Sequence, residues 1–127
     1  MSCLRLLPRK NCLAVLEALA GDARQWTWTI TGDGPQRPEI QQRIADLGLE
    51  DRVFLEGHVE YARLPSYYDE ADVYLQPSLS EPWGLAVNEA MASGKPVLSA
   101  VQCLFWHALR LAGCNTKVEG FGRLMRL

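Results

Sequence analysis

The sequence predicts an α/β protein with a Rossmann-like, doubly wound parallel sheet. Short apolar segments alternate along the chain with segments of helical periodicity, and glycine or proline separates many of them. Nearly continuous apolar strands of this kind are typical of parallel sheets that helices cover on both faces. Right-handed connections between such strands give the doubly wound arrangement. We therefore expect ligands to bind beyond the carboxyl ends of the strands.

The first half of the chain is predicted to form three strands and two helices. The first strand is the apolar run LRLLP, which Pro8 ends, and the later strands are rich in β-branched or aromatic residues. Each helix has leucine or isoleucine at helical spacing and a glycine after its last turn. The predicted strands are residues 4–8, 26–31 and 52–57, and the predicted helices are residues 11–21 and 36–47.

The second half continues the same alternation up to residue 100. A short helix is expected within residues 61–71, begun or interrupted near Pro65, and a longer one within residues 84–93. Strands are expected within residues 72–78 and 95–100. Residues 101–127 lack this pattern, and we expect a helix followed by an irregular segment there.

Composition excludes several classes of function. Hydrophobic residues make up 48% and charged residues 22% of the 127 residues, as in ordinary globular proteins, and the net charge is −2. Without a basic surplus, nucleic acid is not an expected partner. The cysteines Cys3, Cys12, Cys103 and Cys114 have no metal-ligand spacing, so we expect reduced thiols and no metal site. No apolar run is long enough to span a bilayer, and the first ten residues do not resemble a secretory leader.

The segment SEPWGLAVNEAMASGKPVLSA carries the chemistry. Gly84 precedes a predicted helix, whose first turn offers unpaired N–H groups to a phosphate. Glu81 lies before that turn, and Glu89 lies within the helix. Carboxylates bind vicinal hydroxyl groups, so a phosphate flanked by diols, as in a nucleotide sugar, fits this pattern. The spacing by itself is also explained by the preference of glutamate for helix starts.

Residues 80–100 closely resemble the segment of glycosyltransferase family 4 in which two glutamates stand either side of seven residues. RLLPRKN, ITGDGP, LGLEDRVFLEGHV and LPSYYDEADVYLQPS resemble further segments of that family, in the same order. These are retaining enzymes of GT-B architecture, built from two Rossmann-like domains. The resemblance implies that residues 1–100 form the donor-binding domain, with a shortened first strand, and that residues 101–127 form a divergent tail.

The resemblance also implies roles for eight residues. Arg5 and Lys10 match the basic pair that binds the donor diphosphate, and Glu81 matches the glutamate that contacts the donor sugar. The remaining matches are Gly57 beside the base, Trp83, Gly84 and Leu85 over the sugar and phosphate, and Glu89 on the ribose. The implied donor is a UDP-, GDP- or ADP-sugar, bound without a metal or other cofactor. His58 and His107 match no functional position, and Trp26, Trp28 and Tyr74 are expected to pack in the sheet.

Three departures from the family pattern affect this interpretation. Leu4 and Asn11 stand where the family has glycines. The acceptor-binding N-terminal domain of the family has no counterpart in the chain, so we expect negligible turnover from the chain alone. After residue 100 the family's glycine-rich loop is missing, which weakens the prediction of how the donor sugar is held.

Two other functions remain open at this point. The chain could be a non-catalytic nucleotide-sugar-binding remnant of a glycosyltransferase, which would bind the donor without transfer. It could also belong to an epimerase or phosphorylase with the same two-domain architecture. The resemblance implies a cytoplasmic location, and it leaves open a peripheral position at the inner membrane surface because many relatives act on lipid-linked acceptors.

Overall fold

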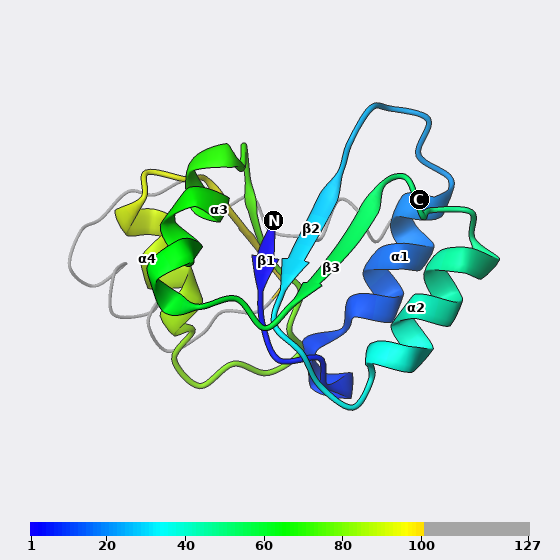
Figure 1. Cartoon of the computed structure of the whole chain (residues 1–127), viewed down its shortest axis with the longest axis horizontal. Helices are drawn as coiled ribbons and strands as arrows, with labels where there is room; N and C mark the ends of the chain where they lie inside the picture. The colour runs from blue at the N-terminus through cyan, green and yellow to red at the C-terminus, as the bar shows by residue number, and fades with distance from the viewer. Residues whose placement is uncertain (101–127) are drawn as a thin grey trace.

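The computed structural model describes residues 1–100, which form five parallel strands and the helices between them (Figure 1). The strands are β1 (Ser2–Cys3), β2 (Trp28–Thr31), β3 (Val53–Gly57), β4 (Tyr74–Gln76) and β5 (Val97–Ser99). The α-helices are α1 (Cys12–Ala20), α2 (Arg37–Asp46), α3 (Leu64–Glu70) and α4 (Leu85–Ala92). Two short 3-10 helices, η1 (Pro8–Lys10) and η2 (Tyr61–Arg63), precede α1 and α3.

The direction in which successive strands are added to the sheet reverses between β1 and β4. One sheet has the order β1-β2-β3, and β4 pairs with β5. The N-terminal residue joins the two, because the Met1 nitrogen donates to the Val73 carbonyl at 2.8 Å and the Leu75 N–H donates to the Met1 carbonyl at 2.8 Å. The order is therefore β5-β4-β1-β2-β3, with the chain running first to one side of β1 and then to the other. Ligands of doubly wound sheets bind at such a switch point.

Helices cover opposite faces of this sheet, as the alternation of side chains in β1 shows. Ser2 contacts Trp28 of the cluster under α1 and α2, whereas Cys3 packs on the cluster under α3 and α4 (Figure 1). The first cluster includes Leu4, Leu6, Val15, Leu16, Trp28, Ile30, Ile40, Ile44 and Val53. The second includes Leu64, Tyr68, Tyr74, Val87, Ala90 and Val97. The predicted doubly wound α/β fold is confirmed.

The prediction for the first strand was wrong in position. The strand lies at Ser2–Cys3, residues 4–7 form a loop in which the Leu7 N–H donates to the Arg5 carbonyl at 2.8 Å, and Pro8 begins η1. Leu4 and Leu6 are still buried, and their N–H groups donate to the carbonyls of Thr31 and Asp33. The apolar pattern therefore identified buried residues correctly, but a tight turn takes the backbone out of strand geometry.

The remaining predicted elements up to residue 100 are present, within a few residues of their expected ends. α3 begins with a proline in its first turn, as expected near Pro65. The helix and irregular segment predicted for residues 101–127 lie outside the described residues. Within residues 1–100, every helix is too short or too polar to cross a bilayer.

Cys12 lies in the first turn of α1 and is fully buried. Burial raises the pKa of its thiol from 9.0 to about 11, against the opposing charge of Lys10. Since the thiol of the unfolded chain ionises near 9, the stability from this group is complete below that pH and is lost as the pH rises towards 11. We expect a loss of about 2 to 3 kcal/mol across this interval. Urea unfolding at pH 8 and pH 11 should show that Cys12→Ala loses less free energy of unfolding between these pH values than the native chain does. Equal losses in the two proteins would contradict the raised pKa of Cys12.

Candidate functional site

The loops after β1 and β4 meet at the carboxyl edge of the sheet. The Leu79 N–H donates to the Arg9 carbonyl at 2.8 Å, which ties the two loops together. Backbone pairing between β1 and β4 has ended below this point: the Cys3 N–H donates to the Tyr74 hydroxyl at 3.3 Å, and the Leu75 carbonyl accepts from the Ser2 hydroxyl at 2.6 Å. The two strands therefore separate, and their loops frame the expected binding crevice.

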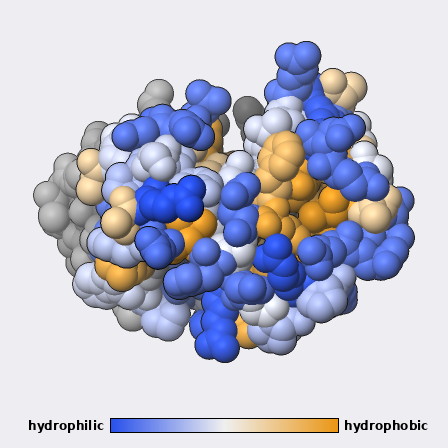
Figure 2. All heavy atoms as spheres, viewed as in Figure 1, coloured by the Kyte–Doolittle hydropathy of each residue, from blue (hydrophilic) through white to orange (hydrophobic). Residues whose placement is uncertain are grey.

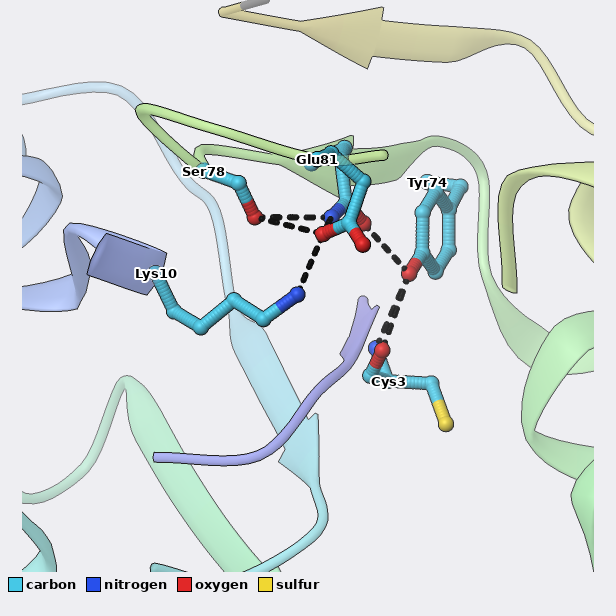
Figure 3. A network of polar contacts seen from close by, with 6 residues as sticks. Cys3, Lys10, Tyr74, Ser78 and Glu81 are labelled. Atoms are coloured by element: carbon cyan, nitrogen blue, oxygen red, sulfur yellow. Dashed lines mark hydrogen bonds and ion pairs between the residues drawn. The ribbon is translucent and has the colours of Figure 1, made fainter. Parts of the chain in front are cut away.

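A largely buried ion pair joins the two loops in this crevice. The Lys10 Nζ donates to Oε2 of Glu81, and the two side chains are only 10% and 14% exposed (Figure 3). The same oxygen accepts from the Gln76 amide at 2.9 Å and from the Ser78 hydroxyl at 3.2 Å. A buried ammonium and carboxylate are costly to desolvate, so such pairs are rarely kept for stability alone. The structure thus brings together two of the predicted site residues.

Sequence reasoning missed Gln76 and Ser78, although a signal was present. In a strand, alternate residues share a face, and Tyr74 and Gln76 are both buried on β4. The Tyr74 hydroxyl donates to the Gln76 Oε1 at 2.9 Å, and the Gln76 amide also donates to Ser78 at 2.8 Å. A glutamine in a short apolar strand needs buried partners, and this requirement pointed towards a polar network at its carboxyl end.

The amino end of α4 follows Glu81 closely in the chain, and Gly84, the residue before the helix, is buried. Gly84 precedes the helix with φ of 80°, a left-handed conformation that favours glycine. Among residues 1–100 no side chain caps the helix, and its first turn has no acidic residue, so no described side chain competes with an anion for its first N–H groups. Trp83 and Leu85 stand on either side with exposed fractions of 54% and 66%. This end of α4 has the features of a phosphate site.

Glu89 occupies a separate position one turn into α4. Its carboxylate accepts a hydrogen bond of 2.9 Å from the hydroxyl of Tyr68 on α3 and makes no hydrogen bond to Glu81 or Lys10. Burial is the main cause that raises the pKa of the Tyr68 hydroxyl far above its ordinary value, so this hydroxyl stays protonated and donates. The two glutamates at either end of the eight-residue spacing are therefore held by different elements.

Arg5 and Gly57 lie on the same edge of the sheet but outside the Lys10–Glu81 network. Arg5 is exposed, and its side chain makes no hydrogen bond or ion pair within residues 1–100. Gly57 is buried at the end of β3, where its carbonyl accepts from the Gly32 N–H at 2.6 Å. Arg5 can therefore turn towards a ligand, and Gly57 marks the far side of the edge, two strands from β1.

Comparison with known proteins identifies the family. The family model described as glycosyl transferases group 1 matches residues 2–113. The chain belongs to the group 1 glycosyltransferases. The match covers both loops that carry Lys10 and Glu81, so the site described above lies within the family domain.

Several group 1 glycosyltransferases are similar in sequence or structure. The 2-deoxystreptamine glucosyltransferase of Streptomyces kanamyceticus is 34% identical over 88 residues, or 69% of this chain. The alpha-monoglucosyldiacylglycerol synthase of Streptococcus pneumoniae is 31% identical over 102 residues, or 78%. The chain spans 23% of the length of each. The solved structure of Anabaena HepE with UDP and glucose has a TM-score of 0.74 and 32% identity, covering 85% of this chain and 30% of HepE.

The two departures from glycine are accommodated in this group 1 domain. Asn11 has φ of 59° after η1, and asparagine is among the few residues that adopt this left-handed conformation readily. The Leu4 side chain is 6% exposed and packs in the cluster under α1 and α2. Its bulk therefore lies in the core, and neither substitution prevents the loop from presenting Lys10. The missing glycine-rich loop after residue 100 lies outside the described residues.

The aromatic side chains expected to pack in the sheet, Trp26, Trp28 and Tyr74, lie in or against the core. Trp28 and Tyr74 are buried, and Trp26 is partly buried against the guanidinium of Arg52, 4.2 Å from the ring centre. His58 is exposed. His107 lies outside the described residues. Among residues 1–100, no three histidine, cysteine or acidic side chains form a candidate metal site.

A hollow lies between the open face of β2 and β3 and the helix α3 (Figure 2). Phe54 and Glu56 of β3 line one side, and Tyr67 and Glu70 of α3 line the other. None of the predicted donor-site residues lines this hollow. It was not anticipated from the sequence, since the outward residues of β3 carry no distinctive pattern.

Proposed function

We propose that this chain is the donor-binding half of a retaining, family 4 glycosyltransferase of GT-B architecture. The observation that carries the proposal is the buried Lys10–Glu81 pair at the point where β1 and β4 separate. A cation for a diphosphate and a carboxylate for sugar hydroxyls lie there in contact, at the place where doubly wound sheets bind their ligands. The donor is a nucleoside-diphospho-sugar.

In this proposal, different groups of the site bind different parts of the donor. Lys10 and Arg5, with the first N–H groups of α4, neutralise the diphosphate as the bond from the sugar to it breaks and negative charge builds up. Glu81 accepts hydrogen bonds from the sugar, and Glu89 accepts them from the ribose. Trp83 and Leu85 flank the sugar and phosphate, and Gly57 lies by the base. The proposal assigns charge neutralisation to protein groups, without a metal or cofactor.

UDP is the first nucleotide to test. Two similar solved structures, Anabaena HepE and the pneumococcal O-GlcNAc transferase GtfA, contain UDP, and GtfA is 33% identical with a TM-score of 0.66. We propose that the acceptor sugar or lipid is held by residues outside this chain. Its hydroxyl oxygen forms the new bond to the donor sugar on the face that the diphosphate leaves, and its proton passes to the departing diphosphate. The cytoplasmic location and a peripheral position at the inner membrane surface stay predictions.

A thermal melt tests the proposal. Millimolar UDP, GDP or ADP is added to the purified chain, and the nucleotide that belongs to the donor is expected to raise the melting temperature by at least about 5 °C at saturation. The reason is that only the folded state binds the nucleotide. Glu89→Ala is expected to lose most of this rise, because the ribose loses its carboxylate.

Tyr68→Phe is the matched control for Glu89→Ala. It removes the same hydrogen bond between α3 and α4 but keeps the carboxylate. It should therefore lower the melting temperature of the free chain while leaving the rise with nucleotide intact. A chain that melts cooperatively and responds to none of the three nucleotides would overturn the proposed function. Equal rises in the native chain and in Glu89→Ala would overturn the role of Glu89.

A further inference from the structure

The two oxygens of the Glu81 carboxylate have different surroundings. Oε2 accepts from Lys10, from the Gln76 amide at 2.9 Å and from the Ser78 hydroxyl at 3.2 Å (Figure 3). Oε1 accepts no hydrogen bond within residues 1–100. Gln76 is 3% exposed and Ser78 is fully buried, whereas Glu81 lies where its loop reaches the surface. Within residues 1–100, one oxygen is anchored by protein donors and the other has none, so it can accept hydrogen bonds from a ligand.

The Gln76 amide can hold Glu81 in only one orientation. Its Oε1 accepts from the Tyr74 hydroxyl at 2.9 Å, so its NH₂ group points to Ser78 and Glu81. Rotation of the amide by 180° would place its oxygen against the carboxylate and its NH₂ group against the tyrosine. Tyr74 is itself fixed, because its hydroxyl accepts from the Cys3 N–H at 3.3 Å and lies 3.1 Å from the Cys3 carbonyl, which is a second acceptor for its single proton. Burial is the main cause that raises the Tyr74 pKa far above its ordinary value, so the hydroxyl keeps its proton.

Lys10 cannot serve Glu81 and a diphosphate equally well. In the free chain its ammonium contacts Oε2 of Glu81, but under the proposed function it must neutralise phosphate oxygens. A buried carboxylate that loses its only cation needs other donors to stay ionised and in place. Gln76 and Ser78 supply two such donors from β4 and the residues just after it, without involving the ligand.

We propose that Gln76 is a positioning residue for donor-sugar recognition. Its amide, aligned by Tyr74 and assisted by Ser78, holds Oε2 of Glu81 so that Oε1 faces the hydroxyl groups of the sugar after Lys10 moves to the diphosphate. The inference rests on the proposed function and extends it from the nucleotide to the sugar. A purely structural Gln76 would instead support the fold without distinguishing a nucleotide from its sugar derivative.

The experiment compares two ligands on one protein. Dissociation constants of UDP, UDP-glucose and UDP-N-acetylglucosamine are measured by calorimetry for the 127-residue chain and its variants. The informative quantity is the ratio of UDP affinity to UDP-sugar affinity, because loss of folded protein changes both equally. In Gln76→Leu we expect UDP affinity to stay within about twofold and the advantage of the better UDP-sugar to fall about fivefold to tenfold.

Two further variants keep the test decisive if Gln76→Leu does not fold. Ser78→Ala removes one of the two neutral donors and is expected to lower the ratio about twofold to threefold. Gln42→Leu is the control for the substitution itself, since Gln42 lies on α2 and its side chain, among residues 1–100, bonds only to Asp46. Its ratio should match that of the native chain. A native chain that binds UDP but prefers neither UDP-sugar would overturn the inference and leave the proposed function standing.

The remaining outcomes also separate the two proposals. An unchanged ratio in folded Gln76→Leu, or in Ser78→Ala where Gln76→Leu is unfolded, would overturn the positioning role alone. Failure of the native chain to bind UDP, GDP or ADP would overturn the proposed function and this inference with it. A fall in the ratio in Gln76→Leu or Ser78→Ala, with Gln42→Leu unchanged, would support the inference.

Discussion

Lys10→Met is expected to lower the free energy of unfolding by about 3 to 5 kcal/mol. The methionine replaces the lysine stem but leaves the Glu81 carboxylate, 14% exposed, without its cation. Two neutral donors from Gln76 and Ser78 remain, and they do not replace a full positive charge in a buried site. Urea unfolding followed by circular dichroism at pH 7 measures the change.

The double variant Lys10→Met/Glu81→Gln is the matched control. It removes both charges and keeps the shape of both side chains, so it should recover most of the lost stability. Under the proposed function, UDP binding should be lost in both proteins that lack Lys10 but kept in Glu81→Gln. If the double variant is no more stable than Lys10→Met, the stability lost in Lys10→Met does not come from leaving the Glu81 carboxylate without its cation.

Gly32→Ala is expected to cost at least about 3 kcal/mol, combining backbone strain with overpacking. Gly32 has φ of 112°, and a Cβ at this position would lie 2.0 Å from the carbonyl oxygen of Leu4. That oxygen belongs to the backbone of the loop leading to Lys10, so relief of the clash must move the loop. We therefore expect a lower melting temperature and, as a consequence, weaker UDP binding by whatever fraction remains folded.

Gly48→Ala separates the two parts of this effect. Gly48 also has a positive φ, 64°, but a Cβ there meets nothing within 4 Å. Its cost should be limited to the left-handed conformation, about 1 to 2 kcal/mol. If Gly32→Ala costs no more than Gly48→Ala in the same melts, the close approach of the β1 loop to the turn after β2 does not constrain the fold.

The glycine-rich turn shows how far a sequence motif can be interpreted. GDGP follows the strand predicted at residues 26–31, and in the structure it follows β2, which ends at Thr31. The motif alone does not reveal the structural role of each of its glycines. The tertiary structure shows that Gly32 is needed for contact with the backbone of Leu4, twenty-eight residues earlier in the chain (32 − 4 = 28). Close backbone approach depends on which strands are neighbours, and local composition does not encode this.

Only part of the site was predicted, because local composition does not encode which distant segments become neighbours. Local signals were sufficient to select Lys10, Glu81, Gly84 and Glu89, because their segments resemble a family. Their partners were not predicted. Glu81 is held by Lys10, seventy-one residues away, and Glu89 by Tyr68 of another helix. Gln76 was included in a predicted strand without a functional role, although its buried polar group requires partners.

By itself the sequence determined the alternation of strands and helices, the apolar residues of the core and the family to which the chain belongs. These depend on periodicity and local propensity, which act over a few residues. Only the tertiary structure decided where β1 begins and that β1 and β4 separate near Glu81. It also decided that, within residues 1–100, the protein donors of Glu81 all bind one of its two carboxylate oxygens. Those features arise from contacts between segments far apart in the chain, and strand order brings these segments together.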